Sequence, residues 1–397
     1  MTILGQFVAN LLLGVGGLAA EPASAIGDVP QTVRVATFNI SFHRSRGGEL
    51  AEQLAGTPRK DPQRIAAILQ EVRPDIVLLN EFDYDPELEA LTSFEQRYLA
   101  VPQGDREPLQ FAYRYAAPVN TGEPTGLDMN RDGSSDGPND AYGFGRYPGQ
   151  YGMVLLSRYP IDVERVRSFR KLLWKSMPGA LLPVDPASSE PYYSPEQLAV
   201  FRLSSKSHWD VPVLIGERML HVLAAHPTPP SFDGPEDRHG RRNHDEIRLW
   251  ADYLSPDRDD YLVDDDGQSG GLLADAAFVI VGDLNADPHD GESANGAIAQ
   301  LLEHPRVRAE PVPMSTGAAE SANVVARANR EHRGDARHDT ANFSSPNGPG
   351  NLRVDYVLPS RELRIVASGV YWPAREEAGH ELLRATDHRL VWVDVAW

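Results

Sequence analysis

The stretch AFVIVGDLNADP, residues 277–288, indicates the kind of fold. Its first residues are apolar and rich in β-branched side chains, which predicts a buried strand. This strand is expected to end in Asp283 and Asn285, with Asp287 just beyond. An acid and an amide suit a core poorly, but the ends of strands commonly carry ligand chemistry because a rigid sheet holds the loops there. We therefore expect the rest of the chain to bring partners to Asp283 and Asn285.

The other apolar segments predict a layered α/β architecture. Residues 32–41 and 74–82 alternate or are apolar throughout, as in strands, and residues 61–72 between them have the apolar spacing of a helix with Asp61 as its N-cap. Further strands are predicted at residues 151–157, 161–169, 210–215, 219–226, 352–360, 363–372 and 387–397, and further helices at 242–254 and 294–304.

The composition fits one soluble globular domain with long loops. The chain has 397 residues, of which 41% are hydrophobic and 24% charged, and it contains no cysteine. The Pro- and Gly-rich segments interrupt a single pattern, so we predict one domain over residues 26–397 with loop insertions at about 102–150 and 171–210. A net charge of −19 argues against general coating of nucleic acid. The lack of cysteine excludes disulfides and thiolate metal sites.

The N-terminal residues 1–25 have the pattern of a signal peptide. An apolar run of the length of a signal h-region is followed by Ala23-Ser24-Ala25, a small-x-small cleavage pattern. The run is too short for a confident transmembrane span. We predict a secreted or periplasmic protein with no stable membrane insertion once the signal is removed. No Lys or Arg precedes the run, so a disordered or packed N-terminal helix is the alternative.

Polar residues of a similar kind stand at the ends of several predicted strands. Each one alone is more often a turn former or a helix cap than a catalyst. Together, however, they are all carboxylates, amides or imidazoles. The carboxylate and amide oxygens suit Mg²⁺, Mn²⁺ or Ca²⁺. The set comprises Asn39, Glu81, His226, Asp283, Asn285, Asp355, Asp387 and His388.

The order of these motifs resembles the endonuclease/exonuclease/phosphatase superfamily, which has the deoxyribonuclease-I-like fold. The motifs are ATFNIS, PDIVLLNEFD, YGMVLLSRYPI, VLAAHPTPP, VIVGDLNADP, RVDYVLPS and TDHRLVWVDV, and they run from about residue 33 to 397. The resemblance implies a four-layered α/β sandwich, in which two mostly antiparallel sheets face each other and helices lie outside. It also implies hydrolysis of a phosphate ester by in-line attack of water.

The resemblance assigns the metal ligands. Glu81 resembles the principal ligand of a divalent cation, with Asn39 beside it and Asp387 near the metal. Mg²⁺ or Mn²⁺ is the expected cofactor, and Ca²⁺ is the alternative.

The resemblance also assigns catalytic roles. Asp283 would position or deprotonate the attacking water, and Asn285 would bind a phosphate oxygen. His388 would bind the phosphate and stabilise the transition state, with Asp355 orienting its ring, and His226 would be a second histidine on the phosphate side.

Two departures from the family pattern favour a phosphatase or phosphodiesterase. Ser41 stands where the abasic-site nucleases carry an acid, and those enzymes lack a histidine at the position of His226. We expect a monomeric enzyme that acts on small extracellular phosphorylated substrates. The alternatives are a secreted nuclease of the same fold, with nucleic acid as its substrate, and a non-catalytic calcium-binding extracellular module.

Two clusters of basic residues are candidates for binding an anionic substrate. They contribute Lys206, His208, Arg242 and Asn243, of which Arg242 and Asn243 stand just before a predicted helix. Local ion pairing with nearby acids is an equally good explanation.

The first insertion contains the sequence DMNRDGSSD. Asp128, Asn130, Asp132 and Asp136 match the start of an EF-hand calcium loop, but the twelfth position is Asn139 in place of glutamate. We predict a loop stabilised by structural Ca²⁺, with a merely acidic turn as the alternative.

Overall fold

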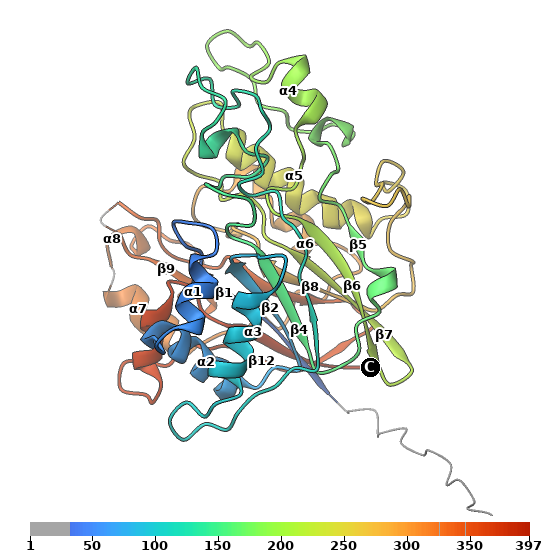
Figure 1. The fold of residues 1–397 in the computed structure, drawn as a ribbon. Coiled ribbons are helices and arrows are strands. Elements are labelled where there is room, and N and C mark those ends of the chain that lie inside the picture. The colour runs from blue at the N-terminus through green and yellow to red at the C-terminus, as the bar shows by residue number, and fades with distance from the viewer. Residues whose placement is uncertain (1–31, 325, 346) are drawn as a thin grey trace, which may run out of the picture.

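The computed structural model describes residues 32–324, 326–345 and 347–397. The predicted signal peptide, residues 1–25, lies outside the described residues. Thirteen strands form three sheets within the described part of the chain. The prediction of a four-layered α/β sandwich is confirmed, because two large sheets face each other and helices cover their outer faces (Figure 1).

The first sheet has six strands in the order β12-β13-β1-β2-β4-β3. Only β1 and β2 pair in parallel, with Val35 opposite Ile76. Strand β1 also pairs with β13, where Val33 lies opposite Val395, so the first and last strands are neighbours. The strands are β1 (Val33–Phe42), β2 (Ile76–Phe82), β3 (Tyr113–Tyr115), β4 (Met153–Ser157), β12 (Arg364–Val370) and β13 (Val391–Ala396).

The second sheet has five strands in the order β11-β8-β7-β6-β5. Strands β7 and β8 are parallel, and Asp355 of β11 lies directly opposite Asp283 of β8. The strands are β5 (Arg167–Ser168), β6 (His208–Ile215), β7 (Arg218–Ala225), β8 (Phe278–Asp283) and β11 (Asp355–Pro359). A small third sheet pairs β9 (Ala341–Phe343) with β10 (Gly350–Leu352).

Apolar side chains fill the three spaces between the four layers. Leu78 of the first sheet and Trp209 and Val279 of the second belong to the core between the sheets. Ile65 and Ile68 of α2 pack on the outer face of the first sheet, whereas Trp250 of α5 packs on that of the second. The helices are α1 (Glu49–Ala55), α2 (Lys60–Val72), α3 (Glu89–Phe94), α4 (Pro195–Val200), α5 (Arg238–Tyr253), α6 (Ala299–Leu302), α7 (Thr316–Val324) and α8 (Ala326–Asn329).

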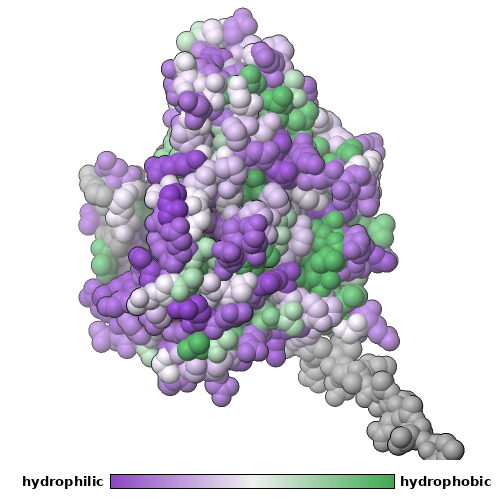
Figure 2. All heavy atoms as spheres, viewed as in Figure 1, coloured by the Kyte–Doolittle hydropathy of each residue, from purple (hydrophilic) through white to green (hydrophobic). Residues whose placement is uncertain are grey.

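The surface agrees with the charged, polar composition. Hydrophilic residues predominate on the face seen in Figure 2. Among the helices of the described residues, none combines the length and apolar character that crossing a bilayer would require.

Several predicted boundaries are wrong. Residues 161–169 form a short 3₁₀ helix at Val163–Arg165 and only the two-residue strand β5, and the predicted helix 294–304 is reduced to a 3₁₀ turn at Ala294–Gly296 and the single turn α6. The insertion predicted at 171–210 ends earlier, because β6 begins at His208. Helix α2 begins at Lys60, so Arg59 is its N-cap.

The insertion at 102–150 packs closely against the segment that precedes β6. Gly143 donates its N–H to Asn120 O at 3.1 Å, and Asn120 in turn donates its N–H to Lys206 O at 2.9 Å. A Cβ atom on Gly143 would lie 2.0 Å from Ser205 O, so no other residue fits without displacing the backbone. The insertion therefore holds the segment that carries Lys206.

Candidate functional site

Asp283, at the end of β8, joins the two large sheets. Asn39 Nδ2 of β1 donates a hydrogen bond to Asp283 Oδ2 at 3.0 Å, and the backbone N–H of Asp283 donates to Asn80 Oδ1 of β2 at 3.3 Å. Asp283 is 1% exposed. Residues of the first sheet therefore hold Asp283, which belongs to the second sheet, at the point where the strand ends meet.

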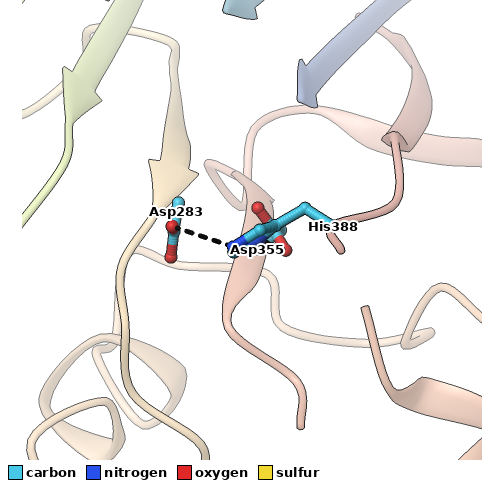
Figure 3. Close-up of side chains that lie close together, drawn as sticks. All are labelled: Asp283, Asp355 and His388. Atoms are coloured by element: carbon cyan, nitrogen blue, oxygen red, sulfur yellow. Dashed lines mark hydrogen bonds and ion pairs between the residues drawn. The ribbon is translucent and has the colours of Figure 1, made fainter. Parts of the chain in front are cut away.

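His388 lies between two carboxylates (Figure 3). Its Nδ1 is 2.9 Å from Asp355 Oδ2, and its Nε2 is 3.7 Å from Asp283 Oδ2. Thr340 Oγ1 donates to the same oxygen of Asp355 at 2.9 Å. The ring of His388 is thus oriented by Asp355, which is held in turn by Thr340.

The charges of this network depend on one another. Burial alone would lower the pKa of His388, but Asp355 and Asp283 raise it to about 10. Burial raises the pKa of Asp283; Asp355 and Glu81 add to this increase, whereas His388 and Asn39 oppose it. His388 is therefore an imidazolium at neutral pH, and Asp283 is a stronger base than an ordinary aspartate.

Glu81 lies on the other side of the site and contacts His43, which was not among the predicted site residues. His43 Nδ1 is 2.7 Å from Glu81 Oε2, and the His43 ring lies 4.6 Å from that of Tyr151. Burial would raise the pKa of Glu81, but the hydrogen bond from His43 and the positive charges of nearby histidines lower it to about 2. Glu81 also has a φ angle of +60°, a strained backbone conformation of the kind that gathers at functional sites.

His226 and Lys206 complete the inner wall. His226 Nε2 lies 3.5 Å from Asp283 Oδ2, and within the described part of the chain its Nδ1 has no hydrogen-bond partner. Burial and the nearby Lys206 hold the pKa of His226 well below its usual value, so its ring is neutral. Lys206 is 6% exposed, its Nζ is 3.4 Å from Pro227 O, and burial lowers its pKa despite the attraction of Glu246, Glu81 and Asp283.

Asn285 and Asp387 lie at the edge of this network. Asn285 Nδ2 donates to Pro227 O at 3.1 Å, which places the amide beside the loop after His226. Asp387 precedes His388, adds to the electrostatic stabilisation of its charged ring and has an exposed side chain. All eight predicted catalytic and metal-binding residues thus come from strand ends or from the loops directly after or before strands.

The donors at the site suit a divalent metal ion. The ligand atoms of Asp283, Asp355 and His388 all lie within 4.8 Å of one another, and among the described residues they form the one group of acids and histidines with this geometry. In this group the histidine ring is already bonded to Asp355. The oxygens of Asn39, Glu81 and Asp387, predicted as ligands, are hard donors of the kind that Mg²⁺ or Mn²⁺ prefers. A metal near Glu81 would thus leave the aspartate and histidine network intact.

Two residues predicted to bind substrate are buried and bonded within the fold. His208 is completely buried; its Nδ1 bonds Ser204 Oγ at 2.6 Å and its Nε2 bonds the carbonyl of Glu246 at 2.8 Å. Arg242 is also buried and donates to the carbonyl oxygens of Leu203, Tyr142 and Arg202. Both ring nitrogens of His208 and the Nε and Nη2 atoms of Arg242 are thus bonded within the fold.

Asn243 has a supporting position. Its Nδ2 donates to Thr228 O at 2.8 Å and to Leu284 O at 3.0 Å. These carbonyls belong to the loops that carry His226 and Asp283. Asn243 therefore ties the two loops together from α5, and of the four predicted substrate-binding residues only Lys206 lies beside the catalytic carboxylates.

The predicted calcium loop is a series of tight turns. Asp128 Oδ2 accepts the N–H of Gly133 at 2.9 Å, and Asp132 Oδ1 accepts that of Ser134 at 2.9 Å. Asn130 Nδ2 donates to Asp132 Oδ2, and Asp136 accepts the hydroxyl of Ser134. The acids of the loop thus accept hydrogen bonds from backbone and side-chain donors of the same loop. Calcium binding stays a prediction.

His43, Thr340 and Asn80 contact the site but were missed from the sequence. Asn80 directly precedes Glu81 at the same strand end, and His43 lies just beyond the strand that carries Asn39, so both had a positional signal. Thr340 had no such signal. It directly precedes β9 and contacts Asp355 only in the folded structure.

Comparison with known proteins finds a family model that matches most of the chain. The model of a family described as "Endonuclease/Exonuclease/phosphatase family" matches residues 36–388. No curated protein sequence matches the chain.

Solved structures resemble the chain at low identity. An endonuclease/exonuclease/phosphatase from Beutenbergia cavernae is 18% identical with a TM-score of 0.48, covering 92% of this chain and 72% of that one. A family protein from Leptotrichia buccalis is 12% identical (TM-score 0.46; 91% and 98% covered). Sphingomyelinase C from Streptomyces griseocarneus is 14% identical (TM-score 0.43; 91% and 99% covered).

Proposed function

The chain belongs to the endonuclease/exonuclease/phosphatase family, and on that premise we propose that it is a metal-dependent phosphoesterase that hydrolyses phosphate esters by in-line attack of water. One observation carries the proposal. The buried Asp283 carboxylate lies 3.5 Å from the His226 ring and 3.7 Å from the His388 ring, where the strand ends of two sheets meet. A base beside a neutral and a charged imidazole provides the groups that hydrolysis of a phosphate ester requires.

Asp283 has the position and basicity of a proton acceptor for water. Burial raises its pKa towards the pH at which the enzyme would work, which favours general-base catalysis. Asn39 occupies Oδ2, and the backbone N–H of Asn285 donates to Oδ1 at 3.0 Å, so the carboxylate is held in one orientation. A water beside Asp283 would therefore be both oriented and deprotonated.

His388 supplies positive charge for the phosphoryl group. Because Asp355 keeps the ring protonated, Nε2 carries a proton that it can donate to a phosphoryl oxygen. His226 is neutral, and its ring can donate one further hydrogen bond from the nitrogen that bears the proton. The Lys206 ammonium adds charge from the same wall, and the amide of Asn285 is placed to bind another oxygen.

The metal would complete the charge balance. A divalent cation, Mg²⁺ or Mn²⁺, held by Glu81 with Asn39 and Asp387 nearby would neutralise the negative charge that builds up on the phosphate. The pKa of Glu81, lowered to about 2, keeps this carboxylate ionised and ready to bind a cation at any physiological pH. His43 fixes one oxygen of Glu81 and leaves the other for the metal.

The substrate we propose is a small extracellular phosphate ester, and the enzyme is proposed to be exported. The net charge of −19 opposes the approach of a long polyanion such as DNA. Arg242, which lies within α5, is buried and donates to backbone carbonyls, so it does not extend the positive surface. Both observations favour a small substrate over a nucleic acid.

A substrate panel tests the proposal. The purified chain would be incubated with nucleotides, sugar phosphates, inositol phosphates, phosphodiesters and duplex DNA, each with Mg²⁺, Mn²⁺ or Ca²⁺, and with EDTA. We expect release of phosphate or alcohol from a small ester with Mg²⁺ or Mn²⁺, and none with EDTA. Asp283→Asn is expected to abolish turnover, whereas Asp105→Asn removes the same charge from a 99% exposed side chain and should have no effect. Turnover by Asp283→Asn would refute the assignment, and preferred cleavage of duplex DNA would favour a nuclease.

A further inference from the structure

A cavity lies beside the network of catalytic carboxylates and histidines, but none of these residues forms its wall. Its volume is about 490 Å³, within the range of pockets that bind small molecules. The walls come from the loop after β8, from α6, and from residues 309–312 and 334–339. None of the eight predicted catalytic and metal-binding residues lines it. Five acids do, namely Asp287, Glu303, Glu310, Asp335 and Asp339.

Asp339 differs from Asp287 and Asp335, the other two aspartates of this cavity. Asp287 accepts three backbone N–H groups, and Asp335 pairs with Arg337. Asp339 is only 7% exposed, yet its carboxylate accepts no hydrogen bond from any described residue. A buried carboxylate normally has a partner, because leaving water without one is costly. The solvent-facing part of the Asp339 side chain is directed into the cavity.

The charges around Asp339 are of one sign. Burial raises its pKa to about 8, and Asp287, Asp290 and Asp335 raise it further; no cation opposes them among the described residues. Arg353 lines the cavity too, but its guanidinium stacks on the ring of Tyr356 at 4.8 Å. Once the pH exceeds about 8, a molecule entering the cavity therefore meets a carboxylate that forms no ion pair with a described residue.

The shape of the cavity favours an organic cation over a metal ion. The one group of described acids and histidines with convergent ligand atoms is Asp283, Asp355 and His388, so the acids here do not converge in that way. A cavity of this volume is also far larger than a metal ion. Apolar side chains form part of the wall, including Ala299, Leu302 and Val312.

We propose that this cavity is a binding site for a small organic cation, an alkylammonium or alkylguanidinium compound. The charged head pairs with the Asp339 carboxylate, and the aliphatic part packs on Leu302 and Val312. The site is separate from the phosphate chemistry and does not depend on it. It adjoins that chemistry, however, because Asp339 directly precedes Thr340, which donates to Asp355 Oδ2.

Calorimetric titration with agmatine tests the site without using catalysis. Agmatine carries a primary ammonium and a guanidinium on an aliphatic chain. We expect saturable binding by the wild type, and Asp339→Asn should weaken it by at least about tenfold. Asp105→Asn, which removes the same charge from an exposed position, should bind as the wild type does. Leu302→Trp reduces the volume of the cavity and keeps its charge, so it should also weaken binding.

The pH dependence provides a second readout. Binding should strengthen as the pH rises through about 8, because the Asp339 carboxyl must lose its proton to pair with a cation. The other titratable or charged groups that line the cavity, besides Asp287 and Asp335, are His289, Glu303, Glu310, His338 and Arg353. Asp339→Asn should lose this pH dependence, which a merely structural change would leave in place.

Three results would overturn the proposal. These are no heat of binding from the wild type with agmatine at about 1 mM, unchanged affinity in Asp339→Asn, and binding of Ca²⁺ or Mg²⁺ chloride that Asp339→Asn removes while agmatine does not bind. Thermal melting checks that the variant folds, and we expect it to be at least as stable as the wild type because a buried charge has been removed. If it does not fold, Leu302→Trp decides, and unchanged affinity there refutes the proposal.

Discussion

The stability of this protein should depend on the neutral state of His208. The ring lies in the core between Ser204 and the carbonyl of Glu246, and it packs edge-on against Trp250. Burial lowers its pKa from 6.5 to about 4. Protonation therefore favours the unfolded chain, whose histidine takes up a proton near its ordinary pKa. The stability that His208 contributes is fully present above pH 6.5 and is lost as the pH falls towards 4.

The size of this effect follows from the two pKa values. A difference of about 2.5 pKa units corresponds to about 3.4 kcal/mol at the acid limit. At pH 5 the loss should already be about 2 kcal/mol, and at pH 4 about 3 kcal/mol. Such a loss is a large part of the stability of an ordinary domain.

Urea unfolding of the wild type and of His208→Gln at a series of pH values measures this contribution. A glutamine can still donate to the Glu246 carbonyl and bond Ser204, but it does not titrate. The stability difference between the two proteins should shrink by about 2 kcal/mol between pH 7 and pH 5. A difference that does not change with pH would refute the reasoning. KM at neutral pH should be unchanged, because His208 does not reach the substrate.

Three further predictions concern the site and its support. His388→Gln should lower kcat by about 10²–10⁴-fold with an unchanged circular dichroism spectrum, because the charged donor is lost; activity within a few-fold of the wild type would contradict its role. Thr340→Val should cost about 2 kcal/mol in urea unfolding, because two backbone N–H groups lose their partner and Asp355 Oδ2 loses one of its two; an unchanged midpoint would show that other groups compensate. Gly143→Ala should cost about 1–3 kcal/mol in the same assay, because its Cβ would meet Ser205 O at 2.0 Å; a neutral result would mean that the insertion moves freely.

The parts of the site that lie in local sequence patterns could be predicted from the sequence. Asp283 and Glu81 each end an apolar strand, and a sheet brings such ends to a common edge whatever the loops do. The family resemblance then assigned them roles. The apolar periodicity likewise predicted most strands of the two large sheets and the greater part of α5, whereas the arrangement of the strands in two facing sheets came from the resemblance.

Burial is the property of the predicted residues that the sequence did not indicate. His208 and Arg242 stand in polar, basic stretches that suggest an exposed patch, yet the packing of α5 against β6 encloses both. No local pattern distinguishes a histidine that bonds a helix carbonyl from one that faces a substrate. For the same reason Asp339 had no signal, because the three acids around it come from two separate segments.

The pairing of β1 with β13 has a consequence for when the enzyme becomes active. The site needs Asn39 from the first strand and His388 from just before the last one, and Val33 lies opposite Val395 in the same sheet. A chain emerging from the ribosome therefore lacks the His388 imidazole, and one neighbour of its central β1 strand, until residues 388–396 have been synthesised. Contacts so distant in sequence also form late in folding. The site therefore cannot assemble before β13 has been made.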